Sequence, residues 1–273
     1  MYWNDLNTHL KRQYGCKVYK LALSSGCSCP NRDGTLGVRG CIFCDGAGAF
    51  AEAGDIPAQL AAARQRVAAK AGQGAKYIAY FQSFTNTYGA PAHLRRLFQT
   101  AIEPEDVAIL SIATRPDCLG PETLELLAEL NRVKPVWVEP GLQTIHPASA
   151  AYIRRGYDLP VFDAAVKRLK AIGVRVIVHQ ILGLPGETPE MMGADQPLHR
   201  AGRSGRRKAP SAPRSAKYGS GGGVAGGPGA DVGIAGIHCR IGAVSPKPAA
   251  GGGHPPAHRR RRQAGSALSP VEW

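Results

Sequence analysis

Residues 107–139 read VAILSIATRPDCLGPETLELLAELNRVKPVWVE and contain a strand, a helix and a second strand in direct succession. Residues 107–114 form a nearly continuous apolar run, which is typical of a strand buried on both faces of a parallel sheet. Residues 121–132 begin with proline and carry leucines at helical spacing, so they predict an amphipathic helix. Residues 136–139 predict the next strand. A strand, one helix and another strand imply a right-handed parallel crossover.

The same alternation extends in both directions from this unit. Strands are predicted for residues 17–23, 76–82, 107–114, 136–139 and 174–182, and helices for residues 57–70, 92–100, 121–132 and 160–172. Such a chain folds as a doubly wound sheet or as a (β/α) barrel, and in both the ligands bind at the carboxyl ends of the strands. The unusual polar, glycine and cysteine residues follow all five predicted strands. This convergence favours an α/β fold of the partial (β/α) barrel type, with about five βα units and a central site.

Charge and cysteine content limit the class of protein. The chain has 273 residues, a formal net charge of +14 and no apolar run long enough to cross a membrane. Its first residues lack the basic and apolar segments of a secretory signal. Four of the seven cysteines fall between residues 27 and 44, which indicates a metal or redox site rather than a disulfide framework. We therefore expect a cytoplasmic protein with no membrane partner.

The composition changes abruptly near residue 190. Residues 191–273 contain 13 Lys and Arg against three Asp and Glu, together with 17 of the 34 glycines. Such a segment cannot bury enough apolar surface to offset the entropy of ordering it. We therefore predict three parts: an N-terminal extension (1–16), a core (17–192) and a disordered low-complexity tail (193–273).

Two explanations of this tail stay open. It is either a genuine basic segment, in which residues 259–262 contact nucleic-acid phosphates, or an out-of-frame translation of a GC-rich gene. We favour the second explanation, because the break at residue 193 falls inside a helix that begins at residues 188–190. A core that ends there has five strands and leaves one sheet edge unpaired.

A glycine-rich loop follows the first predicted strand, and residues 26–44 of it read GCSCPNRDGTLGVRGCIFC. Its four cysteines could hold zinc through four thiolates, hold an iron–sulfur cluster through three or four, or stay unligated. Zinc sites usually use two CxxC pairs, whereas only Cys41 and Cys44 form one here. Cys27 and Cys29 are one residue apart, which is tight for two ligands of one tetrahedral ion. Three thiolates on a [4Fe-4S] cluster, with one iron left open, fit the spacing better.

Five motifs together resemble the radical S-adenosylmethionine (SAM) enzymes, and specifically the YhcC-like family, which is related to the catalytic subunit of Elongator. They are CPNRDGTLGVRGCIFC (29–44), AYFQSFTNTY (79–88), ATRPDCL (113–119), VEPGLQTIH (138–146) and HQILGLPGE (179–187). All five occur in the order of the family, and each lies at the end of a predicted strand. The compact CxxxCxxC motif of most radical SAM enzymes is absent, and the longer spacing resembles that of this subgroup.

The resemblance implies a role for the loop cysteines. Cys29, Cys41 and Cys44 would be the three ligands of a [4Fe-4S] cluster, and the open iron would bind SAM. An electron passed to SAM would release a 5′-deoxyadenosyl radical. Cys27 is an additional thiol that is spare, a packing residue or a competitor of Cys29. We favour Cys29 as the ligand, because PNRDG follows it.

The resemblance also implies SAM contacts at the strand ends. It places the SAM amino group near the loop after the second strand, the ribose and carboxylate after the third and fourth, and adenine on an apolar edge after the fifth. The residues so implied are Gln82, Ser83, Thr85, Thr114, Arg115, Glu139, Gln143, Ile181, Gly183 and Leu184. For Glu139 and Gln143 the alternative is a polar network that fills the barrel interior. His179 lies on the fifth predicted strand, and the sequence identifies no partner for it.

The resemblance also implies a function and partners in outline. A radical SAM enzyme needs a reductant such as flavodoxin or ferredoxin, and these motifs do not identify its substrate. Kinship with Elongator makes RNA a candidate substrate by analogy. The alternative function is a zinc- or cluster-binding nucleic-acid module that uses the basic tail. If the tail is out of frame, its replacement of the true C-terminal part would leave this chain poorly folded or inactive.

Overall fold

The computed structural model describes residues 6–44, 51, 54–194 and 237–239. The strands are β1 (Val18–Leu23), β2 (Lys76–Phe81), β3 (Val107–Thr114), β4 (Val136–Gln143), β5 (Arg175–Val176), β6 (His179–Ile181) and β7 (Ile237–Cys239). The helices are α1 (Leu6–Tyr14), α2 (Ile56–Val67), α3 (Pro91–Ile102), α4 (Pro121–Val133), α5 (Pro147–Tyr152), α6 (Leu159–Ala171) and α7 (Pro189–Ala194), with a short 3-10 helix at Pro116–Cys118.

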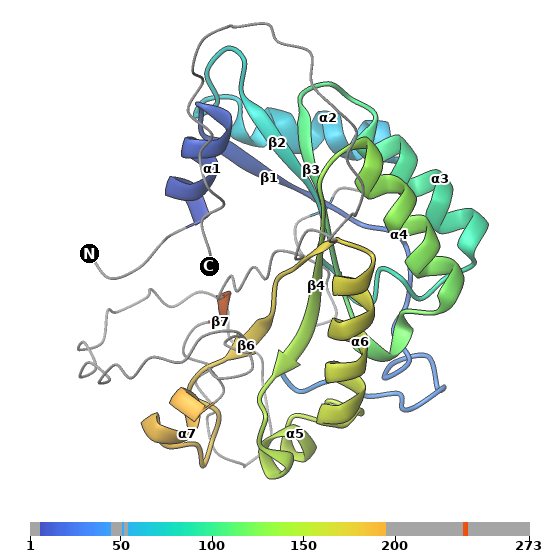
Figure 1. The fold of residues 1–273 in the computed structure, drawn as a ribbon, viewed down its shortest axis with the longest axis vertical. Coiled ribbons are helices and arrows are strands. Elements are labelled where there is room, and N and C mark those ends of the chain that lie inside the picture. Colours follow the sequence, from blue (N-terminus) through green and yellow to red (C-terminus); the bar gives the residue numbers. More distant parts are fainter. Residues whose placement is uncertain (1–5, 45–50, 52–53, 195–236, 240–273) are drawn as a thin grey trace, which may run out of the picture.

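The strands form one sheet with helices on both sides. Strands β1, β2, β3 and β4 lie side by side in chain order and pair in parallel, and both β5 and β6 pair in parallel with β4. Helices α2, α3, α4 and α6 cover one face of the sheet, and α1 lies against the other (Figure 1). The α/β fold of the partial barrel type is therefore confirmed.

Most elements begin and end close to their predicted bounds. Strand β3 has the predicted bounds, and α4 differs by one residue. Proline stands in the first turn of α2, α3, α4 and α6, where its missing N–H costs no hydrogen bond. Helices α1 and α5 are not predicted from the sequence. No helix in the described part of the chain is long and apolar enough to span a membrane.

The two faces of the sheet bury different sets of apolar side chains. On the helix side, Leu21 and Leu23 of β1 pack with residues of α2, α3, α4 and α6. On the opposite side, Val18 of β1 packs with Trp137 and with Leu10 of α1. Helix α1, in the predicted N-terminal extension, therefore packs on the face of the sheet opposite α2, α3, α4 and α6, which we call the inner face.

The fifth predicted strand, residues 174–182, is split into β5 and β6. The N–H of Ile177 donates to the carbonyl of Val138 at 2.9 Å. Residues two apart along a strand share one edge, so the next donor of β4 on this edge would be the amide of residue 140. That residue is proline and has no N–H, so the ladder is interrupted there. Pairing resumes between Gly141 and His179, where the register shifts.

The predicted tail lies outside the described residues except at two places. Helix α7 extends to Ala194, and Ile237–Cys239 forms β7, which pairs antiparallel with β6. The expectation of an unpaired edge beyond the fifth predicted strand is therefore wrong for β6. The backbone N–H and C=O groups at the edge of a sheet are a template for another strand, and residues 237–239 pair with β6 in this way. Disorder of the tail and a shifted reading frame stay predictions.

We expect Leu10→Ala to lower the free energy of unfolding by about 2–5 kcal/mol, because Leu10 is 2% exposed and leaves a cavity under the sheet. Lys11→Ala is the matched control, since Lys11 is exposed on the same helix. Urea denaturation of the full chain measures both variants. Equal stability of the two would show that α1 does not seal the inner face.

Candidate functional site

The segments that carry the five motifs meet at one edge of the sheet. Parallel strands have their carboxyl ends on the same edge, and each of these segments leaves the sheet there. They are the cysteine loop (residues 24–44) after β1, residues 82–88 after β2, residues 114–118 after β3, residues 143–157 after β4 and residues 182–188 after β6.

Three of the loop cysteines share one environment. Cys29, Cys41 and Cys44 are partly exposed, and the guanidinium of Arg32 interacts electrostatically with all three. Burial raises the pKa of Cys41, a hydrogen bond from Asn31 opposes this, and the neighbouring Cys29 and Cys44 raise it further. Within the described ranges, no three cysteine, histidine or carboxylate side chains converge closely enough to hold a single ion. The three thiols therefore lie within electrostatic range of Arg32 and of one another, without converging on one point.

Cys27 lies in a different environment. Its side chain is buried in the helix-side core, and a Cβ added at Gly89 would lie 3.1 Å from its sulfur. Burial raises the pKa of this thiol as it raises that of Cys41, so packing in the core, and not the pKa, sets Cys27 apart from the other three. Cys27 is therefore a packing residue, which is one of the three roles that the sequence leaves open.

Arg32 fixes the shape of the cysteine loop. It donates a hydrogen bond of 2.5 Å to the carbonyl of Cys44, and its guanidinium lies over the ring of Phe84. A Cβ added at Gly40 would lie 2.9 Å from this guanidinium, and Gly40 has a φ of +67°. Both observations favour glycine at position 40, which directly precedes Cys41.

The segment after β2 carries the residues predicted for the SAM amino group. Gln82 is exposed, Ser83 is half-buried and Thr85 is fully buried. The N–H of Thr85 donates to the carbonyl of Ser28 at 3.3 Å, so the segment lies against the cysteine loop. The buried hydroxyl of Thr85 has no hydrogen-bond partner in the described structure. A ligand that supplies a partner would remove this energetic cost.

Thr114 and Arg115 are buried at the end of β3. The hydroxyl of Thr114 lies 2.6 Å from that of Thr87 in the segment after β2. Arg115 donates to the carboxylate of Asp117 at 3.0 and 2.7 Å and to the carbonyl of Arg155 at 2.9 Å. The guanidinium of Arg115 is therefore engaged by the protein itself and joins two of the segments around the site.

Glu139 is the centre of a polar network on the inner face of the sheet. Its side chain has no exposed surface, and its carboxylate accepts hydrogen bonds from Ser111, from Lys20 at 3.4 Å and from His179 at 2.6 Å. Burial alone raises the pKa of Glu139, but these partners outweigh it and lower the pKa to about 2. Glu139 thus forms the internal network that the sequence leaves open as an alternative. It is also the partner of His179 that the sequence does not reveal, because the two lie on different strands.

Among the described residues, three other than glycine have a left-handed backbone, and all three lie at this edge. They are Phe84, Gln143 and Arg154, with φ of 62°, 64° and 54°. The side-chain amide of Gln143 folds back over Gly141, where an added Cβ would lie 2.5 Å from Nε2. Each such conformation costs about 1–3 kcal/mol and persists only where the surroundings enforce it. Strain of this kind is typical of functional sites.

The end of β6 contacts the cysteine loop through apolar side chains. Ile181 and Leu184 are buried with Ile153, and Phe43 of the loop packs against them. Gly183 lies between them with a φ of +84°. The apolar edge predicted for adenine is thus continuous with the residue that precedes Cys44.

The same segment ends in a carboxylate that is only partly paired. One oxygen of Glu187 accepts a hydrogen bond of 2.6 Å from Thr144, and the other is buried with no partner among the described residues. Sequence reasoning did not single out Glu187, although it closes the HQILGLPGE motif.

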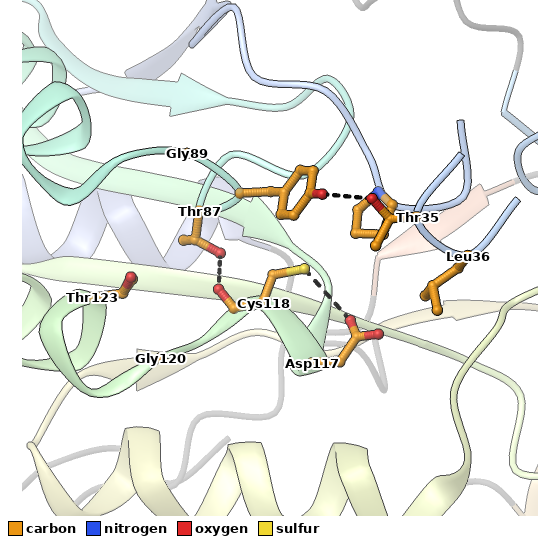
Figure 2. A pocket seen from close by; sticks show the side chains of 10 residues that line it. Thr35, Leu36, Thr87, Gly89, Asp117, Cys118, Gly120 and Thr123 are labelled. Carbon is orange, nitrogen blue, oxygen red and sulfur yellow. Dashed lines mark hydrogen bonds between the residues drawn. The ribbon is translucent and has the colours of Figure 1, made fainter. Parts of the chain in front are cut away.

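A cavity of about 640 Å³ opens beside this site, between the cysteine loop, the segment after β2 and the start of α4 (Figure 2). Figure 2 shows the hydroxyl of Thr35 bonded to Tyr88, and that of Thr87 bonded to the carbonyl of Cys118. Burial raises the pKa of Cys118 to about 12, so its thiol is neutral. The lining is formed by Pro30, Thr35, Leu36, Thr87, Tyr88, Gly89, Asp117, Cys118, Gly120 and Thr123, and it includes none of the predicted cluster or SAM residues.

Comparison with known proteins identifies the family. The model of the radical SAM superfamily matches residues 31–195, which is more than half of the chain. The chain belongs to the radical SAM superfamily. It is 44% identical over 194 residues to the protein YtqA of Bacillus subtilis and 39% identical over 185 residues to the protein YhcC of Escherichia coli. The resemblance to the YhcC-like family is therefore confirmed.

The matches cover part of each relative. They include 70% and 67% of this chain, and the chain spans about 60% of the length of YtqA and of YhcC. Among solved structures, the chain is similar to the archaeal Methanocaldococcus infernus Elp3 with an N-terminal deletion, with a TM-score of 0.45 and 18% identity. That match covers 64% of this chain and 40% of Elp3.

We expect Glu139→Gln to lower the free energy of unfolding by about 3 kcal/mol at pH 7, because Lys20 and His179 lose their buried counter-charge. The pKa of Glu139 is lowered from 4.5 to about 2, so the ionised carboxylate stabilises the fold above about pH 5 and this contribution is lost as the pH falls toward 2. The wild type should therefore lose more stability than the variant between pH 6 and pH 3. Denaturant titrations across this range measure the difference, with the exposed Glu129→Gln as control. Parallel pH curves for wild type and Glu139→Gln would contradict the assignment.

Proposed function

We propose that this chain is a radical SAM enzyme whose cysteine loop holds a [4Fe-4S] cluster through Cys29, Cys41 and Cys44. The observation that carries the proposal is the separation of the four loop cysteines into two environments. Three are partly exposed and within electrostatic range of Arg32 in the loop after β1, and the fourth, Cys27, is buried in the core. A soft thiolate set of this kind suits iron–sulfur ligation.

The unpartnered hydroxyl of Thr85 supports a ligand on the same edge. It is buried next to the cysteine loop, and a polar group of SAM could satisfy it. We propose Gln82, Ser83 and Thr85 for the SAM amino group, Thr114 and Gln143 for the ribose and carboxylate, and Ile181, Gly183 and Leu184 for adenine. With the cluster and SAM bound, the chemistry supplied is reductive cleavage of SAM to a 5′-deoxyadenosyl radical.

We assign Arg115 and Glu139 a positioning role within this proposal. Arg115 is buried and holds the backbone of the segment after β4, and Glu139 holds Lys20, Ser111 and His179 together on the inner face. Each side chain would act on SAM through the residues that it positions. Apolar side chains such as Trp137 fill the part of the inner face next to α1, and they would help to exclude water from the radical.

Reductant and substrate belong to the proposal as well. We propose flavodoxin or ferredoxin as the electron donor. We also propose that this chain and its electron donor are in the cytoplasm. RNA is the substrate class to test first, because the motifs resemble a family related to the catalytic subunit of Elongator. The competing function is a zinc- or cluster-binding nucleic-acid module that uses the basic residues of 193–273.

Metal content separates the two functions. Anaerobic reconstitution of the full chain with iron and sulfide should give brown protein, and alanine at Cys29, Cys41 or Cys44 should abolish iron binding. Cys27→Ala should keep the iron and lose only thermal stability, because Cys27 packs in the core. Iron and zinc analysis of all four variants measures this. Colourless wild type with stoichiometric zinc would refute the enzyme proposal, and iron lost only in Cys27→Ala would reverse the choice of ligand.

Thr85→Val tests the SAM contact. We expect it to weaken SAM binding about five- to tenfold, the effect of one hydrogen bond, and to leave the iron content unchanged. It should also stabilise the SAM-free protein, because it removes a buried hydroxyl without a partner. Equilibrium dialysis and thermal denaturation measure the two effects, with Thr100→Val on the exposed side of α3 as control. Unchanged SAM affinity, with SAM still cleaved to 5′-deoxyadenosine, would remove Thr85 from the site.

A further inference from the structure

Asn31 contacts one of the three loop cysteines through its side-chain amide. Its side chain is buried, and Nδ2 lies 3.3 Å from the sulfur of Cys41. The same nitrogen lies 2.9 Å from the carbonyl oxygen of Arg154 and 3.2 Å from that of Arg155. The sequence alone assigns Asn31 no role, so its contact with the cysteine is a finding of the structure.

The two carbonyl groups fix which way the amide points. A carbonyl oxygen only accepts hydrogen bonds, so the NH₂ group of Asn31 must face Arg154 and Arg155, and it therefore faces the sulfur of Cys41 as well. The opposite end of the amide is equally constrained. A Cβ added at Gly156 would lie 2.7 Å from Oδ1 of Asn31, so the side-chain amide keeps this position only beside glycine.

The acceptors themselves are held by buried side chains. Arg115 donates to the carbonyls of Arg155 at 2.9 Å and Gly156 at 3.4 Å. Arg155 in turn donates to the carbonyls of Leu142 at 2.8 Å and Thr144 at 2.6 Å, at the end of β4. The position of the Asn31 amide is thus set by β3 and β4 rather than by the cysteine loop alone.

The contact matters most when Cys41 is a thiolate. As a thiol, Cys41 donates to the carbonyl of Arg154 at 3.4 Å. As a metal ligand it has no proton to donate, and its negative sulfur faces that carbonyl oxygen. The NH₂ group of Asn31, whose two hydrogens have three acceptors within reach, touches both groups and is a donor that can offset this repulsion.

We propose that Asn31 is a positioning residue that donates a hydrogen bond to the Cys41 thiolate and thereby raises the reduction potential of the cluster. This inference rests on the proposed function. Reduction adds negative charge to a cluster, and an N–H donor to a ligand sulfur stabilises the more negative state. One amide would therefore make the cluster easier to reduce without contacting SAM or substrate.

The first test compares Asn31→Ala and Asn31→Asp with the wild type after reconstitution. Both variants keep the three cysteines, so we expect unchanged iron content. The ratio of reduced to oxidised cluster at a fixed potential should fall roughly three- to tenfold, the ratio for one net hydrogen bond, and further in Asn31→Asp. Redox titration followed by electron paramagnetic resonance measures this ratio. Asn131→Ala is the control, because Asn131 also binds backbone through its amide, at the opposite end of the sheet.

The second test leaves Asn31 in place and moves its amide. Gly156→Ala places a methyl group against Oδ1 of Asn31, whereas Gly173→Ala meets nothing within 4 Å. The two glycines have φ of +79° and +77°, so the backbone strain of the two variants is matched. We expect Gly156→Ala to shift the redox ratio in the same direction as Asn31→Ala, and Gly173→Ala to leave it unchanged.

Two outcomes would overturn the inference. One is a redox ratio equal to that of the wild type in both Asn31 variants with the cluster intact. The other is loss of iron in both Asn31 variants while Asn131→Ala stays loaded, which would assign Asn31 to loop assembly alone. A wild type that binds no cluster is a different result, and it would count against the proposed function.

Discussion

Two buried arginines hold the carboxyl edge of this protein together. Arg115 and Arg155 lie against the ring of Tyr157, each 4.8 Å from its centre, and their N–H groups donate to backbone carbonyls of the segment after β4. Burying a guanidinium is costly unless its hydrogen bonds are made, so both side chains require that segment in one conformation. The cysteine loop then docks on it through Asn31 and through the N–H of Ile42, which donates to Ile153. The geometry of the three thiols therefore depends on residues more than a hundred positions away.

The sheet separates two kinds of interior, one on each of its faces. The helix side of the sheet is apolar and takes in Cys27, which is consistent with a thiol that stays neutral. The inner face holds an apolar layer next to α1 and, further along the strands, the network of Lys20, Ser111, Glu139 and His179. Alternation along β1 alone sends Leu21 to one side and Lys20 to the other. One strand thus contributes both to the core and to the polar interior.

Local sequence signals predicted the strands and helices well where one residue pattern fills a whole element. Strand β3 and helix α4 are examples, since a continuous apolar run and a proline-led leucine pattern leave few alternatives. The break between β5 and β6 was missed because its cause, Pro140, is on the neighbouring strand. For the same reason, the sequence does not reveal the partner of His179 or the different environments of Cys27 and Cys29. Contacts between distant segments determine these features, and a motif read along the chain does not contain them.

The backbone at Arg154 shows how such distant contacts act. A left-handed arginine has no local advantage, because its Cβ crowds the chain and costs about 1–2 kcal/mol. The conformation directs the Arg154 carbonyl at the cysteine loop, where it meets both Asn31 and Cys41. Two neighbours maintain this strained conformation. The side chain of Arg155 donates a hydrogen bond to the carbonyl of Leu142 in β4, and Gly156 leaves room for the side chain of Asn31. Strain at one residue is thus offset by hydrogen bonds at its neighbours, and the result is a rigid support under one of the three thiols. A site that must hold a ligand set in one geometry needs such support, because a glycine-rich loop has little stiffness of its own.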